Sequence, residues 1–414
     1  MRWSAVVFLS LLAVPAAAQS DPSLEHARAI LRTTPLIDGH NDLPWAIRRF
    51  DKAPFDVDAY DLSQRAPGQT DIARLRKGMV GAQFWSVYIP GEIPDSGYAR
   101  VQLEEIDIAR RMIAKYPDDL ALALSTEDIE REFKAGRIAS LIGMEGGHAI
   151  ENSLGALRAY YDLGVRYMTL THNVTLDWAD AAHGQQRHGG LTAFGHEVVR
   201  EMNRLGMLID LSHVSPNVMR QAIETSESPV IFSHSSARAV TDVPRNVPDE
   251  ILRLLPANGG VVMVTFVPEF ISETVLAAAN ARRSDVRTLF QGVTEPAERR
   301  RIWQDYSRTH PMPRATVADV ADHIDHVRRV AGVDHVGIGS DFDGIDRGPT
   351  GLEDVSTFPT LFAELIRRGW SDADLRKLAG ENVLRAFRAA EHTARRLQQE
   401  RPPSTATLEA LDRN

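Results

Sequence analysis

The stretch Leu36-Ile37-Asp38-Gly39-His40-Asn41-Asp42 joins a short apolar run to side chains that can bind a metal ion. This design recurs along the chain, where apolar runs rich in Ile, Val, Leu or Phe alternate with helical patterns. Short runs of this composition, bounded by Gly, Pro, Asn, Asp or Ser, are typical of strands. The chain contains eight of them, at residues 36–37, 81–87, 139–144, 167–170, 207–211, 229–232, 260–267 and 335–338.

Helical patterns lie between most of these runs. Alternating strands and helices predict a parallel sheet covered by helices, and eight is the number of strands that closes a (β/α)8 barrel. We therefore expect an α/β protein of the TIM-barrel type; an open, doubly wound sheet is the alternative. The predicted helices are 103–113, 129–133, 154–163, 194–205, 317–330 and 371–387, the last with Ser371 as a candidate N-cap.

The two ends of the chain fall outside this alternation. Arg2, the apolar residues 5–18 and Ala16-Ala17-Ala18 before Gln19 are typical of a signal peptide. We expect residues 1–18 to be removed during export, which leaves a periplasmic or secreted protein. One (β/α)8 domain should then span 19–390, with a charged insertion near 271–313. Residues 391–414 are polar and are expected to form a mobile tail.

The composition excludes some classes of protein and restricts the ligands of a metal site. Hydrophobic residues make up 43% of the 414 residues, enough for a large core. The formal net charge of −9 argues against a nucleic-acid-binding surface. The chain has no cysteine, so any metal site must use histidine and carboxylate ligands.

Six of the eight runs end in polar residues that can bind metals or substrates. In a parallel barrel the carboxyl ends of the strands meet at one rim, where active sites form. We therefore expect a metal site at the carboxyl ends of the strands. The six polar segments are residues 38–42, 143–148, 171–173, 210–213, 233–236 and 339–344.

Five of these residues form a candidate site for two metal ions. His40 and Asp42 face the same side of an extended strand, so that one nitrogen and one oxygen can bind a single cation. Glu145 can bridge two ions through its two oxygens, and His213 and His234 add two imidazoles. A single histidine at a strand end is more often a packing residue, but five ligands together favour a metal centre. None of the lysines closes an apolar run, which disfavours a bridging carboxylated lysine.

Four further histidines have weaker signals. His323 and His326 share a helix face with Asp319 and Asp322, which predicts a solvated surface. His183 and His188 lie in a loop rich in Gly and Gln and are candidates for the entrance of the site.

Seven motifs resemble those of the membrane (renal) dipeptidase family, a branch of the amidohydrolase superfamily. They occur in the family's order and cover residues 25–390. The motifs are Ile37-Asp38-Gly39-His40-Asn41-Asp42, Gly143-Met144-Glu145-Gly146, Leu170-Thr171-His172-Asn173, Asp210-Leu211-Ser212-His213, Phe232-Ser233-His234-Ser235-Ser236, Arg245-Asn246-Val247-Pro248-Asp249 and Gly339-Ser340-Asp341-Phe342-Asp343-Gly344.

The resemblance implies a dipeptidase with two Zn²⁺ ions per chain. It assigns His40 and Asp42 to one zinc ion and His213 and His234 to the other. Glu145 and a water or hydroxide would bridge the two ions, and that hydroxide would attack the amide bond of the dipeptide. Dipeptides with an L- or a D-residue at the C-terminal position are both implied substrates, and opening of β-lactams is an implied side activity.

The resemblance also implies three residues that act on the substrate. His172 would stabilise the developing oxyanion, Arg245 would bind the free carboxylate, and Asp341 would transfer the proton of the water to the leaving amine. Each has a plainer interpretation from the sequence: Arg245 as a salt bridge to Asp249, Asp341 as a turn residue, and His172 as a remote hydrogen-bonding residue.

Partners and other functions stay open at this stage. The chain lacks the cysteines and the lipid-anchor signal of the animal members, so we expect small dipeptide substrates, no nucleic acid and no stable membrane anchor. The absence of cysteines still allows a non-covalent homodimer. The alternatives to a dipeptidase are another amidohydrolase that acts on N-acyl amino acids, a non-catalytic zinc-binding protein, and an interaction protein, for which no repeat is present.

Overall fold

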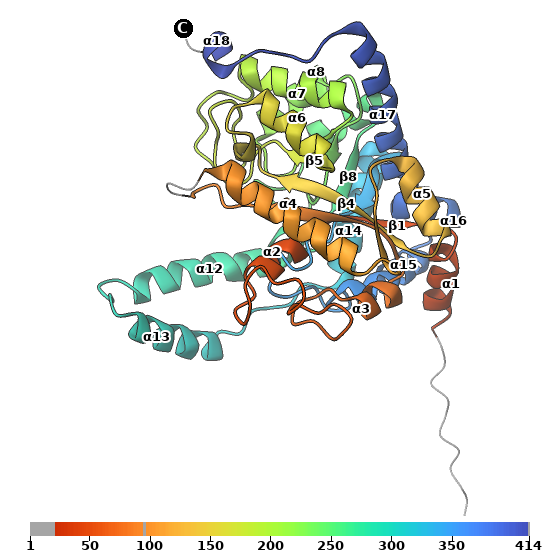
Figure 1. Cartoon of the computed structure of the whole chain (residues 1–414). Helices are drawn as coiled ribbons and strands as arrows, with labels where there is room; N and C mark the ends of the chain where they lie inside the picture. The colour runs from red at the N-terminus through yellow and green to blue at the C-terminus, as the bar shows by residue number, and fades with distance from the viewer. Residues whose placement is uncertain (1–20, 94–96, 413–414) are drawn as a thin grey trace, which may run out of the picture.

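Eight parallel strands form a closed barrel in the computed structural model, which describes residues 21–93 and 97–412 (Figure 1). The strands follow the order β2-β1-β9-β8-β7-β6-β5-β4, and β2 also pairs with β4, which closes the sheet. This closure confirms the (β/α)8 barrel and excludes the open sheet. The barrel strands are β1 (Leu36–Asn41), β2 (Val80–Tyr88), β4 (Ile138–Glu145), β5 (Val165–Thr169), β6 (Leu208–Asp210), β7 (Ile231–Phe232), β8 (Val261–Val264) and β9 (Val336–Ile338).

Each predicted run overlaps one barrel strand, but two features differ. A ninth strand, β3 (Leu120–Leu122), pairs with β4; its Leu and Ala residues favour helices and do not indicate a strand. Strand β1 continues beyond its apolar residues through Asp38 and His40. His40 is therefore held by the ladder of the barrel itself rather than by a loop.

Helices surround the barrel, and several begin at a side chain that caps the first turn. Ser125, Ser153, Ser215 and Ser371 each accept a hydrogen bond from a backbone N–H of that turn, so the predicted cap at Ser371 is present. The helices are α1 (Pro22–Leu31), α2 (Leu43–Arg48), α3 (Ile72–Lys77), α4 (Tyr98–Lys115), α5 (Thr126–Lys134), α6 (Leu154–Asp162), α7 (Ala193–Leu205), α8 (Pro216–Thr225), α9 (Asp249–Leu252), α10 (Leu255–Asn258), α11 (Pro268–Ile271), α12 (Glu273–Leu289), α13 (Pro296–Thr309), α14 (Val317–Ala331), α15 (Phe358–Arg367), α16 (Asp372–Arg376), α17 (Asn382–Glu400) and α18 (Leu408–Asp412).

A buried cluster in the strands lies directly below the metal-binding residues. It contains Ile37, Phe84, Leu141 and Tyr167, all with no exposed surface. Gly143 leaves room for the Tyr167 ring, since a Cβ at this glycine would lie 2.0 Å from Tyr167 Cζ. The core therefore supports the site from beneath and fixes the position of one tyrosine.

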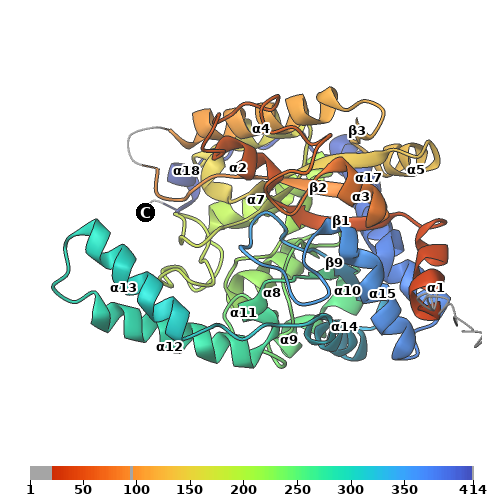
Figure 2. The same ribbon diagram turned by 90° about the horizontal axis from the view of Figure 1, so that it is seen from below.

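The charged segment that interrupts the alternation forms a helical hairpin between β8 and β9. Helices α12 and α13 lie side by side and project beyond the barrel in both views (Figures 1 and 2). Helix α13 buries no residue, and Trp303 on it is 41% exposed. The hairpin, residues 273–309, is thus an arm that is attached to the barrel at one end and is called the arm below.

The end of the chain differs from the polar, mobile tail that the sequence predicts for residues 391–414. Helix α17 continues to Glu400 because Ala390, Ala394 and Leu397 form a buried stripe at helical spacing. Beyond it, Leu408 is buried, and the Asp412 carboxylate accepts hydrogen bonds at the start of α7. The segment 391–412 is therefore packed against the domain.

The histidines of α14 correct another expectation. His323 has no exposed surface, and its Nδ1 accepts a hydrogen bond of 3.0 Å from the backbone N–H of Ala237. His326 is 7% exposed and lies 2.7 Å from Asp249 Oδ1. The predicted solvated face is wrong because α14 turns this side toward the loop after β7.

The predicted signal peptide, residues 1–18, lies outside the described residues. Within 21–93 and 97–412, no helix combines the length and the apolar character that crossing a bilayer requires.

Candidate metal centre

The predicted site residues meet at the carboxyl ends of the barrel strands. A cavity of about 470 Å³ opens there and is lined by seven of them, while His40 lies at its floor with Nε2 3.4 Å from Asp42 Oδ2. The structure thus brings together all eight residues that the sequence singles out, from six different strand ends. The seven that line the cavity are Asp42, Glu145, His172, His213, His234, Arg245 and Asp341.

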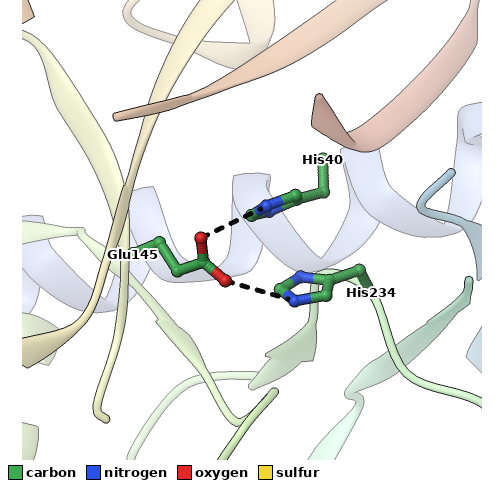
Figure 3. Close-up of side chains that lie close together, drawn as sticks. All are labelled: His40, Glu145 and His234. Carbon is green, nitrogen blue, oxygen red and sulfur yellow. Dashed lines mark ion pairs between the residues drawn. The ribbon is translucent and has the colours of Figure 1, made fainter. Parts of the chain in front are cut away.

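Glu145 occupies the centre of this group. Its Oε2 lies 3.6 Å from His40 Nε2, and its Oε1 lies 2.9 Å from His213 Nε2 and 3.4 Å from His234 Nε2. In Figure 3 the carboxylate lies between the rings of His40 and His234, with one oxygen directed to each. Both oxygens therefore face imidazole nitrogens from different strands, as a bridging carboxylate would.

Hydrogen bonds fix the protonation of two of these imidazoles. Ser233 Oγ donates to Asp210 Oδ2 at 2.6 Å, so it must accept the hydrogen bond of 2.8 Å from His234 Nδ1. In the same way, His213 Nδ1 donates to Asn173 Oδ1 at 3.2 Å. With the proton on Nδ1, the Nε2 atoms of both rings direct lone pairs into the site.

The third imidazole is oriented from inside the barrel. Tyr167 donates its hydroxyl proton to the Gly39 carbonyl at 3.3 Å, so its oxygen accepts from His40 Nδ1 at 2.8 Å. His40 Nε2 is buried and has no hydrogen-bond partner among the described residues. A buried nitrogen without a partner is costly unless a cation binds it.

The donor set fits a metal ion on physical grounds. His213 Nε2 and His234 Nε2 are 2.9 Å apart with lone pairs facing each other, a repulsive arrangement that a shared cation relieves. Burial holds the pKa of both histidines well below its usual value, which keeps them neutral and able to bind metal. Neutral imidazoles and carboxylates are the ligands that zinc prefers in the absence of cysteine.

The ligand atoms are numerous enough for more than one ion. Three sets of residues each have ligand atoms that all lie within 4.8 Å of one another, and Glu145 and His40 each belong to two sets. His40 and Asp42 share one set, whereas His213 and His234 fall in separate sets that both contain Glu145. The sets are His40, Glu145 and His234; Glu145, His172 and His213; and His40, Asp42 and Asp341.

His172 and Asp341 lie beside the metal-binding group. His172 Nε2 is 3.9 Å from Glu145 Oε1, and burial lowers the pKa of this histidine, so that it is neutral. Burial and the neighbouring Asp42 carboxylate raise the pKa of Asp341 well above its usual value. Asp341 and His213 both have a positive φ, of 66° and 68°, a conformation that side chains other than glycine adopt at a cost.

Arg245 supplies a buried positive charge at the wall of the cavity. It is 2% exposed, and its contacts to Ser235 Oγ and the His234 carbonyl are long, at 3.4 Å each. Burial lowers its pKa to about 10, so it stays cationic at neutral pH. The expected alternative partner, Asp249, instead contacts His326 and Arg253. The guanidinium is therefore free to bind an anionic group in the cavity.

The sequence did not indicate several residues of the site. Tyr167 reads as an ordinary strand aromatic, and Ser233 as part of a motif without a separate role. Glu269 and Arg283 also line the cavity, and Arg283 belongs to the arm. Only the three-dimensional structure shows that these residues reach the site. Of the two loop histidines, His183 lines the cavity as predicted, whereas His188 contacts the Leu176 carbonyl instead.

Tyr167→Phe should weaken metal binding without removing a ligand. The variant leaves the His40 Nδ1–H without its acceptor, and loss of such a partner typically lowers metal affinity about 10- to 100-fold. Competition with a chromogenic chelator measures this affinity. Tyr160→Phe is the matched control, because Tyr160 also donates a buried hydrogen bond, to the Ala149 carbonyl, but outside the cavity. Equal metal affinity in the two variants would contradict the role of Tyr167.

A closed parallel barrel with imidazoles and carboxylates at the carboxyl ends of its strands defines the class of amidohydrolase-like metal-dependent hydrolases. Within this class the chain belongs to the membrane dipeptidase family, peptidase family M19, whose family model matches residues 24–401. This confirms the family that the motifs indicate, and the protein is a metallo-dipeptidase of that family.

Individual relatives agree with this assignment. The chain is 44% identical to Dipeptidase 3 of Rattus norvegicus over 379 residues, which is 90% of this chain and 68% of the relative. It is 45% identical to Dipeptidase 3 of Mus musculus over the same shares of both chains. Among solved structures it resembles the probable dipeptidase PvdM from Pseudomonas aeruginosa, with a TM-score of 0.78 and 26% identity over 91% of this chain and 100% of that chain.

Proposed function

We propose that this protein is a zinc dipeptidase with two Zn²⁺ ions per chain. The observation that carries the proposal is the set of three Nε2 atoms, from His40, His213 and His234, that converge on the Glu145 carboxylate. Asp42 completes the ligand set, and Glu145 serves as the bridge. When bound, the zinc ions supply a nucleophile near neutral pH and polarise the scissile carbonyl.

The remaining residues act on the dipeptide itself. Arg245 binds the C-terminal carboxylate with its planar fork of donors, which places the adjacent amide bond over the metal centre. His172 donates a hydrogen bond to the carbonyl oxygen as negative charge develops there. Asp341 lies beside Asp42 and passes the proton of the water to the leaving amine.

The dipeptide is favoured over other amides by the position of Arg245. Arg245 lines the cavity as a buried guanidinium, and a peptide that continued past the anchored residue would have no carboxylate at this position to pair with it. An N-acyl amino acid keeps the carboxylate and is the second candidate substrate. Turnover of L,D-dipeptides and of β-lactams is proposed as an extension of the same chemistry.

A substrate panel tests this function. The zinc-loaded protein should hydrolyse L,L- and L,D-dipeptides with a kcat/KM at least about 100-fold above that for tripeptides and N-acetyl amino acids. Release of free amino acids is the measurement, with a penem added for the β-lactam activity. Faster turnover of N-acetyl amino acids than of any dipeptide would replace the proposal by the second candidate.

We also propose that the protein works outside the cytoplasm after cleavage of residues 1–18. Its partners would be small dipeptides, without nucleic acid and without a stable membrane anchor, and a non-covalent homodimer fits the same picture. N-terminal sequencing of the mature protein after expression with its natural leader tests the cleavage site; a chain that starts at Met1 would refute it.

A further inference from the structure

A second cavity adjoins the metal centre. It has a volume of about 720 Å³ and lies between the arm and the loop after β9. Four residues line both cavities and form their common wall: Val267, Glu269, Phe270 and Ile345. The arm thus adds a space directly next to the substrate site of a barrel that is otherwise complete.

The common wall contains an ion pair that the arm supplies. Arg283 of α12 forms a salt bridge with Glu269, and Arg283 also lines the cavity of the metal centre. The pair neutralises the only acidic residue of the common wall. The common wall therefore has no net negative charge that would repel an anionic group extending from one cavity into the other.

The second cavity is otherwise rich in arginine. Arg282, Arg314 and Arg347 line it, against Glu269, which Arg283 neutralises, and Asp346. Arg314 has only a distant carboxylate partner, Glu353 at 3.9 Å. This positive lining stands out in a chain with a formal net charge of −9.

Polar atoms in this cavity also lack partners. Arg282 Nε and Ser307 Oγ are buried without a hydrogen-bond partner among the described residues. Arg347 forms no ion pair with any residue in the described ranges. Arg282 and Arg347 thus have donors available for a ligand. The buried Nε of Arg282 is satisfied when an acceptor binds, and Arg347 is an exposed side chain of the cavity lining.

Phe270 connects the second cavity with the expected carboxylate anchor. Arg245 Cζ lies 5.5 Å from the centre of the Phe270 ring, and Phe270 belongs to the common wall. The substrate residue whose carboxylate pairs with Arg245 is therefore the one next to this wall. Its side chain, rather than that of the N-terminal residue, is adjacent to the second cavity.

We infer that the second cavity is a specificity subsite for an anionic group on the C-terminal residue of the dipeptide. Resting on the dipeptidase function proposed above, this inference names the substrate class: dipeptides with a carboxylate side chain at the C-terminal position. Arg282 and Arg347 bind that carboxylate, while Arg245 binds the main-chain carboxylate.

Paired substrates of equal shape test the subsite. The ratio of kcat/KM for alanyl-glutamate to that for alanyl-glutamine should be at least about tenfold in the wild-type protein, because charge-assisted hydrogen bonds replace neutral ones. The double variant Arg282→Gln/Arg347→Gln should bring this ratio close to one, mainly through the KM for alanyl-glutamate. Arg287→Gln, on the same helix but lining neither cavity, should keep the wild-type ratio.

A single variant separates binding from support of the arm. Arg282 also contacts the Trp303 ring at 5.1 Å and donates to the His310 carbonyl, whereas Arg347 has no such contact to the arm. Arg347→Gln alone should lower the ratio. A wild-type ratio near one, or an unchanged ratio in both variants, would overturn the subsite. Hydrolysis of alanyl-glutamine in the same experiment would still support the proposed dipeptidase function. Failure to hydrolyse any dipeptide would instead refute the proposed function.

Discussion

Glu145→Gln is expected to lose both its metal and its activity. The amide keeps the shape of the side chain but removes the negative charge on which His40, His213 and His234 converge. Breaking a buried charge interaction of this kind costs about 3–5 kcal/mol, so kcat/KM for a dipeptide should fall roughly 150- to 5,000-fold. Elemental analysis of the purified variant should find less than the wild-type content of zinc.

A buried glutamate elsewhere provides the control for this variant. Glu201 is 2% exposed and pairs with Arg204 on α7, outside the cavity. Glu201→Gln should retain metal and activity even if its melting temperature falls. Chelation of the wild-type protein, followed by addition of zinc, gives the reference for full loss and recovery. Wild-type metal content together with wild-type kcat/KM in Glu145→Gln would exclude the bridging role.

Arg245→Ala should lower dipeptide turnover while the metal content stays complete. Arg245 is a buried cation that lines the cavity and is not itself one of the candidate metal ligands. Truncating one partner of a buried charge pair costs about 2–5 kcal/mol, which corresponds to a loss in kcat/KM of roughly 30- to 5,000-fold. Part of this loss should return in Arg245→Lys, which restores the charge but not the planar fork.

A neutral substrate makes the test of Arg245 specific. The wild-type protein should prefer alanyl-alanine to alanyl-alaninamide, and Arg245→Ala should lose this preference because only the acid pairs with the guanidinium. Arg253→Ala, on the exposed side of α9, should keep it. If Arg245→Ala slows the acid and the amide equally, the arginine does not bind the substrate carboxylate.

Much of the fold could be predicted because its signals are local. A strand buried on both faces must be apolar, and a helix on a barrel must repeat its apolar residues, so each element is visible within about ten residues of sequence. This is why all eight barrel strands overlap their predicted runs, including β7 with only two residues, Ile231 and Phe232. Strand β3 was missed because it consists of Leu and Ala, which favour helices, and has no β-branched residue.

Burial by tertiary contacts caused the errors. His323 and His326 have acidic neighbours on their helix, a local pattern typical of a surface, but α14 packs this face against the loop after β7. Likewise, the polar composition after residue 390 hides the stripe of Ala390, Ala394 and Leu397 that holds α17 on the barrel. In both cases the deciding contact involves residues far away in the chain.

The amino-acid sequence by itself determined the barrel, the candidate ligands His40, Asp42, Glu145, His213 and His234, and the family, because residue type and periodicity are properties of short segments. Only the tertiary structure decided the protonation of the imidazoles and the shape of the substrate site. His40 is oriented by Tyr167, 127 residues later, and the wall beside Arg245 depends on a salt bridge from the arm. Such contacts form between segments that meet only when the chain folds, and no local pattern encodes them.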